Sequence, residues 1–235
     1  MPTFAAMKIG ILTAMTSEHD QLAALLEDKV EIHSGHFTYT MGRCGHNDII
    51  LRQCGIGKVN AAIGTTELIR SFSPQCVIST GVAGGIDSRL AIMDVVVGQQ
   101  TCYHDVWCGM GCEYGQIQGQ PTYFKGNPLL VDHALSLDTP TTIHAGLICT
   151  GDQFITAQRE LEKIKRMFPD GLACDMESAA IAQTCHIFNV PFVSFRIISD
   201  TPGIKEHSEQ WDNFWTDIAD RSFHVTKTYL ETLPN

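Results

Sequence analysis

Three carboxylates stand where the chain is expected to leave a β-sheet. Glu18 follows an apolar run at the start of the chain, Asp200 ends another near its close, and Glu177 lies just ahead of a helical pattern. Ligands of layered α/β proteins collect at the carboxyl ends of strands. Carboxylates that meet there would suit cleavage of a glycosidic bond, because one acid protonates the leaving group while another activates water.

Each of these residues also has a simpler structural interpretation. Glu18 is placed to be a first-turn carboxylate facing a helix dipole, and Asp200 with Ser199 to cap a following helix. Phe154, which follows another expected strand, is a typical core aromatic residue. The glycine-rich run 81–85 matches neither a dinucleotide-binding nor a P-loop pattern and is expected to form a tight turn. Periodicity does not bring the acids together, so both interpretations stay open on pattern alone.

The elements that must position these residues alternate between short β-branched runs and longer helical periodicities. Strands alternating with helices indicate a sheet covered by helices on both faces, and an early meander of strands adds antiparallel pairing. We therefore predict an α/β fold, a three-layer αβα sandwich with a central mixed, twisted β-sheet. Strands are expected at 8–13, 30–33, 37–41, 48–54, 75–80, 94–103, 145–150 and 191–198, and helices at 17–26, 60–72, 157–167, 176–188 and 208–230.

The chain of 235 residues is long enough for one large domain with a sizeable core. No internal repeat, low-complexity segment or linker rich in Pro, Gly or Ser divides it, so we expect a single domain over residues 1–235. Residues 1–6 are expected to be a disordered N-terminal extension, with Met7 as an alternative start.

The acidic balance of the chain argues against two classes of partner. A formal net charge of −10 without any basic block suits neither a nucleic-acid surface nor an anionic membrane. No apolar stretch reaches the roughly 18 residues of a membrane span, and no basic residue precedes a short apolar run at the start, as in a secretory signal. We expect a cytoplasmic protein.

Nine cysteines, an odd number with irregular spacing, do not indicate a disulfide framework. A cluster of His104, Cys108 and Cys112 around Trp107 lacks the four ligands and tight pairs of a zinc site, so we expect neither a metal nor another cofactor. Most of the others lie in apolar runs, where free cysteine in a reducing compartment acts as a small core residue. These are Cys54, Cys76, Cys102, Cys149, Cys174 and Cys185.

A series of short motifs runs in order along nearly the whole chain. They are 7–11 (MKIGI), 14–15 (AM) with Glu18, 55–59 (GIGKV), 80–85 (TGVAGG), 103–105 (YHD), 113–116 (EYGQ), 151–155 (GDQFI), 175–177 (DME), 189–192 (NVPF) and 196–200 (RIISD). Each motif alone is weak. The ordered set resembles the 5′-methylthioadenosine/S-adenosylhomocysteine nucleosidases, within the wider nucleoside phosphorylase family.

This resemblance implies roles for four residues around an adenine base. Asp200 would donate a proton to N7 of adenine, which makes the base a neutral leaving group, and Ser199 would hold that aspartate. Phe154 would stack on the purine, and the backbone around Ile155 would read its Watson–Crick edge. A carboxyl group that is protonated near neutral pH needs a raised pKa, so we expect an apolar pocket around Asp200.

The resemblance implies a second set of roles at the ribose. Glu177, with Met176, would bind the ribose hydroxyls. Glu18, aided by Arg196 and Glu177, would position and deprotonate the attacking water. Carboxylates at this point would also stabilise the positive charge of an oxocarbenium-like transition state.

The rest of the implied site accepts the sugar and its 5′-alkylthio substituent. Val82 stands where some relatives have a serine, which removes one polar contact near the ribose. In the family a loop matching 103–114 lines the 5′ pocket across a dimer interface, so the resemblance implies a homodimer. The remaining substrate-binding residues are Val82, Ala83 and Gly84 at the ribose and Met15, Ile56 and Trp211 at the 5′ group.

The expected function is therefore hydrolysis of a small-molecule nucleoside, and three other functions stay open. An aminodeoxyfutalosine nucleosidase shares the adenine and ribose and differs at the 5′ end. A purine nucleoside phosphorylase needs a cationic cradle for phosphate, whereas Thr16, Ser17 and Glu18 follow the first strand. A non-catalytic nucleoside-binding or storage protein would not require all three acids.

Overall fold

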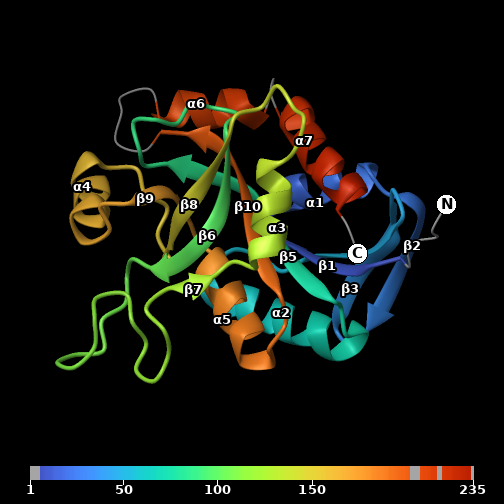
Figure 1. Ribbon diagram of the computed structural model, residues 1–235, viewed down its shortest axis with the longest axis horizontal. Helices are drawn as coiled ribbons and strands as arrows, with labels where there is room; N and C mark the ends of the chain where they lie inside the picture. Colours follow the sequence, from blue (N-terminus) through green and yellow to red (C-terminus); the bar gives the residue numbers. More distant parts are fainter. Residues whose placement is uncertain (1–5, 202–206, 216–218, 234–235) are drawn as a thin grey trace.

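Ten strands form one mixed sheet, and seven helices pack around it, in the part of the chain that the structure describes (Figure 1). This computed structural model describes residues 6–201, 207–215 and 219–233. The predicted α/β fold is confirmed. The strands are β1 (Lys8–Thr13), β2 (Glu27–Ser34), β3 (Phe37–Cys44), β4 (Asn47–Gln53), β5 (Cys76–Gly85), β6 (Val95–Tyr103), β7 (Phe124–Lys125), β8 (Ile143–Thr150), β9 (Gly171–Asp175) and β10 (Phe192–Asp200). The helices are α1 (Thr16–Ala24), α2 (Lys58–Phe72), α3 (Pro128–Leu135), α4 (Gln158–Met167), α5 (Ser178–Phe188), α6 (His207–Asn213) and α7 (Ala219–Thr232).

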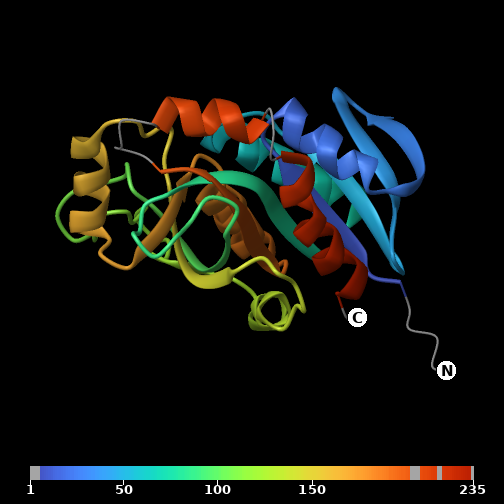
Figure 2. The same cartoon turned by 90° about the horizontal axis from the view of Figure 1, so that it is seen from above.

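The sheet closes on itself at one end and stays open at the other. Strand β10 pairs antiparallel with β6 and parallel with β5, while β8 and β9 complete the ring between β6 and β5. From β5 the order continues through β1 and β4 to the predicted antiparallel meander of β2, β3 and β4. Both views place α4 at one end of the molecule and the β2–β3 hairpin at the other (Figure 2).

Helices cover both faces of the sheet because its central strands are apolar on both sides. In β1, Ile9 and Ile11 face a core that α1, α3 and α7 share. The next residue, Leu12, faces a second core together with α2 and α5. Side chains of successive strand residues point to opposite faces, so a continuous apolar run places a helix layer on each face.

Two local predictions are wrong, the first because tertiary pairing overrides a local signal. The glycine-rich run 81–85 forms no turn but extends β5, where β9 and β10 hydrogen-bond to it. The helix expected from Met176 begins at Ser178, which leaves Met176 and Glu177 in the connection after β9. Helices α6 and α7 cover most of the helix predicted over 208–230, and residues 216–218 between them lie outside the described residues. The sequence patterns also missed β7, β9 and α3.

The N-terminal residues and the lengths of the helices bear on two further expectations. Of the expected extension 1–6, residues 1–5 lie outside the described residues, and Ala6 is exposed. Within the described ranges, every helix is too short or too polar to cross a bilayer.

Candidate active site

One cavity of about 390 Å³ lies where β1, β5, β8, β9 and β10 end. A volume of this size suits a small-molecule ligand. It brings together twelve of the predicted site residues, whereas Arg196 and Ser199 lie behind its wall. The lining residues are Ala14, Met15, Glu18, Ile56, Val82, Ala83, Gly84, Gln153, Phe154, Ile155, Cys174, Asp175, Met176, Glu177, Asp200 and Trp211.

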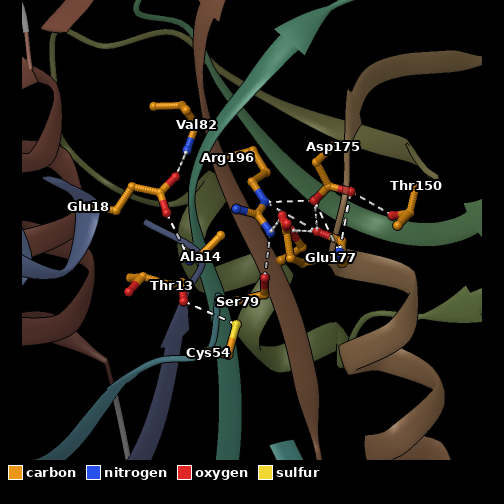
Figure 3. A network of polar contacts seen from close by, with 12 residues as sticks. Thr13, Ala14, Glu18, Cys54, Ser79, Val82, Thr150, Asp175, Glu177 and Arg196 are labelled. Carbon is orange, nitrogen blue, oxygen red and sulfur yellow. Dashed lines mark hydrogen bonds and ion pairs between the residues drawn. The ribbon is translucent and has the colours of Figure 1, made fainter. Parts of the chain in front are cut away.

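The carboxylate of Glu18 joins the start of α1 to β5. Its Oε2 accepts hydrogen bonds from the backbone N–H groups of Ala14 (2.9 Å) and Met15 (3.0 Å), and its Oε1 accepts one from Val82 (3.0 Å; Figure 3). The side chain is 1% exposed. Burial raises the pKa of Glu18, and nearby Arg196 together with the three N–H donors offsets part of that rise. The first-turn interpretation is therefore correct but incomplete, since the carboxylate also reaches a second element.

Residue 81 must be glycine because the Glu18 carboxylate and the Arg196 guanidinium lie directly against its backbone. A Cβ atom at Gly81 would lie 2.3 Å from Glu18 Oε1 and 2.9 Å from Arg196 Nη1, and the backbone φ is +144°. Only glycine leaves room for the two charged groups at this φ.

Glu177 lies in the connection between β9 and α5 and lines the same cavity as Glu18. Its Oε1 accepts a hydrogen bond from the Gly57 N–H (2.9 Å), and its carboxylate lies 3.9 Å from Arg196 Nη2. Burial raises the pKa of Glu177 to about 7, with Arg196 and the Gly57 N–H opposing the rise and Asp175 and Glu18 adding to it. A carboxyl group with this pKa can gain or lose a proton near neutral pH.

Arg196 is a fully buried cation held between carboxylates behind the cavity. Its Nε lies 2.9 Å from Asp175 Oδ2, and its Nη2 donates to Ser79 Oγ (2.7 Å; Figure 3). Asp175 also accepts from Thr150 Oγ1 (2.6 Å) and from Ser178. Because every partner is itself hydrogen-bonded, the guanidinium is fixed in place with its charge balanced.

Asp200 is the last residue of β10 and does not cap a helix. It is 2% exposed, and Ser199 Oγ donates to its Oδ1 at 2.6 Å. The lining of the same cavity includes the apolar residues Ile155, Cys174 and Val82.

The outer part of the cavity is apolar and open. Phe154 is 54% exposed, so the core interpretation of this residue is wrong, and its ring lies 5.4 Å from that of Trp211 in an edge-on contact. Ile56 is 51% exposed, whereas Ile155 is buried. Exposed aromatic and aliphatic groups at the mouth of a cavity provide a surface for a planar or alkyl ligand.

The model of the Phosphorylase superfamily matches residues 8–231. The chain belongs to this superfamily. The 5′-methylthioadenosine/S-adenosylhomocysteine nucleosidase of Hydrogenovibrio crunogenus is 41% identical over 233 residues, which cover 97% of this chain and 98% of the relative.

Two solved structures in the same comparison have similar folds. The 5′-methylthioadenosine/S-adenosylhomocysteine nucleosidase from Colwellia psychrerythraea 34H, in complex with adenine, is 36% identical with a TM-score of 0.91, covering 98% of this chain and 97% of that one. The futalosine hydrolase of Helicobacter pylori is 30% identical with a TM-score of 0.89, covering 97% and 99%.

Four residues of the cavity wall received no role in the sequence analysis: Ala14, Gln153, Cys174 and Asp175. Asp175 is the important omission, because it holds Arg196. A signal was present, since a buried strand that contains an arginine requires an anionic partner, and Asp175 stands in the same motif as Glu177.

Cysteines and metal-ligating groups form no additional centre in the described residues. No group of three or more His, Cys, Asp or Glu side chains there is arranged to hold a metal ion. Cys108 is exposed and Cys112 half-buried, whereas five of the six cysteines predicted for the core are buried. The sixth, Cys54, is half-buried and bonds to the Thr13 carbonyl through Sγ (3.1 Å).

Proposed function

We propose that the chain hydrolyses the N-glycosidic bond of 5′-methylthioadenosine and S-adenosylhomocysteine, releasing adenine and the 5′-thio-substituted ribose. The observation that carries this proposal is the convergence of Glu18, Glu177 and Asp200 on one cavity. Relatives that match nearly the whole chain carry this activity in their names, and one of them binds adenine.

Asp200 is the general acid of the proposed reaction. Its carboxyl group protonates N7 of adenine, so the base leaves as a neutral molecule, an effect typically worth about 10²–10⁴-fold. The hydrogen bond from Ser199 fixes the orientation of that carboxyl group. Phe154 stacks on the purine, and the backbone around Ile155 binds its edge.

Glu18 and Glu177 act on the sugar side. Glu177, with Met176, binds the ribose hydroxyls, and Glu18 accepts a proton from the attacking water. Desolvation raises the pKa of the Glu18 carboxylate and thereby makes it a stronger base than an exposed carboxylate. Arg196, which is paired with Asp175, supplies a positive charge that partly balances the negative charge of the carboxylates.

The charge of the cavity wall supports water over phosphate as the nucleophile. Glu18, Asp175, Glu177 and Asp200 line the cavity, whereas its described lining contains neither lysine nor arginine. Arg196 is engaged by Asp175 behind the wall. Phosphate would meet like charge without the cationic cradle that its binding requires. Met15, Ile56 and Trp211 form the apolar slot for the alkylthio group, next to Val82, Ala83 and Gly84 at the ribose.

The decisive experiment is adenine release from a panel of nucleosides, with and without phosphate. We expect phosphate-independent release from methylthioadenosine and adenosylhomocysteine, and a loss of about 10²-fold or more in kcat for Asp200→Asn. Phosphate-dependent release would indicate a phosphorylase. A preference for aminodeoxyfutalosine would indicate an aminodeoxyfutalosine nucleosidase. Binding of a nucleoside without release of adenine would indicate a storage protein.

We also propose a homodimer in the cytoplasm, built from a single domain. Val59 and Ile63 on α2 and Trp107 and Met110 in the loop after β6 are exposed apolar side chains that a second copy would cover. The free cysteines suit a reducing compartment. Light scattering of the purified protein, cell fractionation and the cooperativity of unfolding test these three points.

A further inference from the structure

An ion pair outside the cavity lining connects three loops at its rim. Lys58 Nζ lies 2.7 Å from Asp105 Oδ2 and 2.8 Å from Asp105 Oδ1. Asp105 Oδ2 also accepts the backbone N–H of Asp152 (2.9 Å), and Asp152 Oδ1 accepts the backbone N–H of Lys58 (2.8 Å). The loops before α2, after β6 and after β8 are thereby closed into one ring of hydrogen bonds.

Each side of this ring adjoins a part of the active site. Gly57, directly before Lys58, donates its N–H to Glu177 Oε1 at 2.9 Å. Asp152 directly precedes the cavity-lining segment 153–155. A Cβ at Gly57, whose φ is +95°, would lie 3.0 Å from Asp152 Oδ1, so the two loops are in close contact at that point.

We propose that the Lys58–Asp105 pair is a positioning device that holds the Gly57 N–H on Glu177 and fixes the 153–155 segment on the opposite side of the substrate. Neither side chain lines the cavity. The inference rests on the proposed function for its kinetic part only, because its geometric part concerns the Gly57 hydrogen bond itself.

A second ion pair in the chain provides a matched control. Lys165 Nζ lies 3.0 Å from Asp87 Oδ2, and their side chains are 28% and 13% exposed, against 23% and 17% for Lys58 and Asp105. Lys165 belongs to α4, and neither residue of this pair lines the cavity. Replacing each pair removes the same two charges at similar burial. Asp87 also pairs with Arg89 (2.7 Å), and Lys165 Nζ also donates to the Pro169 and Gly171 carbonyls, so the control removes at least as many contacts but at a site away from the cavity.

The pH dependence gives a readout that a purely structural role would not change. The groups facing Glu177 are Arg196 from β10, Asp175 from β9, Glu18 from α1, the thiol of Cys54 after β4 and the Gly57 N–H. The N–H acts to lower the pKa of Glu177. Loss of that hydrogen bond raises this pKa further. Removal of Lys58 and Asp105 together leaves the net charge unchanged, so the shift reports the lost hydrogen bond rather than a changed field.

The test compares K58M/D105N with K165M/D87N and wild type. In K58M/D105N we expect kcat/KM for adenine release to fall about tenfold or more, its acid limb to move to higher pH, and exchange of the Gly57 amide with deuterated solvent to accelerate. Asp105→Glu, which keeps a carboxylate opposite Lys58, retains most of the wild-type kcat/KM. The control variant also loses stability, by an amount that includes the lost Asp87–Arg89 pair, but keeps the wild-type pH profile and Gly57 exchange rate.

Two outcomes overturn the proposal. One is an unchanged Gly57 exchange rate in K58M/D105N, which is decisive even if the wild type cleaves no nucleoside. The other is an equal fall of kcat/KM, without a pH shift, in both double variants. Failure of the proposed function is seen separately, as absence of adenine release by the wild type.

Discussion

Replacement of Glu177 by glutamine should raise the stability of the protein relative to wild type as the pH increases from 5 to 8, while it impairs catalysis. Burial raises the pKa of Glu177 from its ordinary 4.5 to about 7, and Asp175 and Glu18 add to the rise. Between these two pH values the folded protein holds a proton that the unfolded chain has released. The folded state therefore loses stability as the pH rises from about 4.5 to about 7.

The size of this effect follows from the same pKa values. A difference of this size corresponds to roughly 3 kcal/mol in total, at about 1.4 kcal/mol per unit. Between pH 5 and pH 8 the unfolding free energy of Glu177→Gln should rise relative to wild type by about 2–3 kcal/mol. Glutamine can still accept the Gly57 hydrogen bond, and Arg196 keeps Asp175 at 2.9 Å. The amide NH2 then replaces the oxygen that lies 3.9 Å from Arg196 Nη2, and this adds a cost that is the same at every pH and leaves the change between pH 5 and pH 8 intact.

The assay is urea denaturation of both proteins at several pH values, read by tryptophan fluorescence. The difference between variant and wild type isolates Glu177, because all other groups titrate in both proteins. Glu162→Gln changes an exposed carboxylate on α4 and serves as the control, with a pH-independent difference expected. If the unfolding free energies of Glu177→Gln and wild type change in parallel from pH 5 to pH 8, burial does not raise the pKa of Glu177 and the reasoning is refuted. Its kcat should fall about 10²-fold or more, because the carboxylate no longer binds the ribose.

Three further predictions use other parts of the site. Gly81→Ala should reduce kcat/KM sharply and lower the melting temperature, because its Cβ would lie 2.3 Å from Glu18 Oε1; wild-type activity would show that the glycine is not required. Phe154→Ala should raise KM by about 10-fold, whereas Phe154→Tyr should keep it, as measured by adenine release, since stacking on a base is worth about 1–3 kcal/mol. A thiol reagent should modify Cys108 first and Cys112 next in the native protein, as read by mass spectrometry, because most other thiols are buried; rapid labelling of the rest would contradict the fold.

Local pattern was sufficient for most elements, and twelve of the residues named from the sequence line one cavity. The apolar run in β1 indicates burial on both faces, and the alternation of strands and helices indicates the α/β class. The motif order identified Glu18, Glu177 and Asp200 together with Phe154, through resemblance rather than through periodicity. That the chain forms a single domain, and that these residues act as proposed, stays a prediction.

Tertiary structure decided what the pattern left open. The run 81–85 has the composition of a turn, yet β9 and β10 draw it into the sheet, where Gly81 makes room for Glu18. The capping and core alternatives for Asp200 and Phe154 could be excluded only once their surroundings were known.

The sequence by itself determined which residue types are present, where short strands and helices form, and which motifs follow one another. Closure of the sheet through β10, the convergence of distant carboxylates and their raised pKa values were decided by the folded structure alone. The physical reason is that desolvation and charge–charge interaction depend on distances between atoms in space. Glu177 receives its hydrogen bond from Gly57 and its counter-charge from Arg196, and neither residue is its neighbour in the chain.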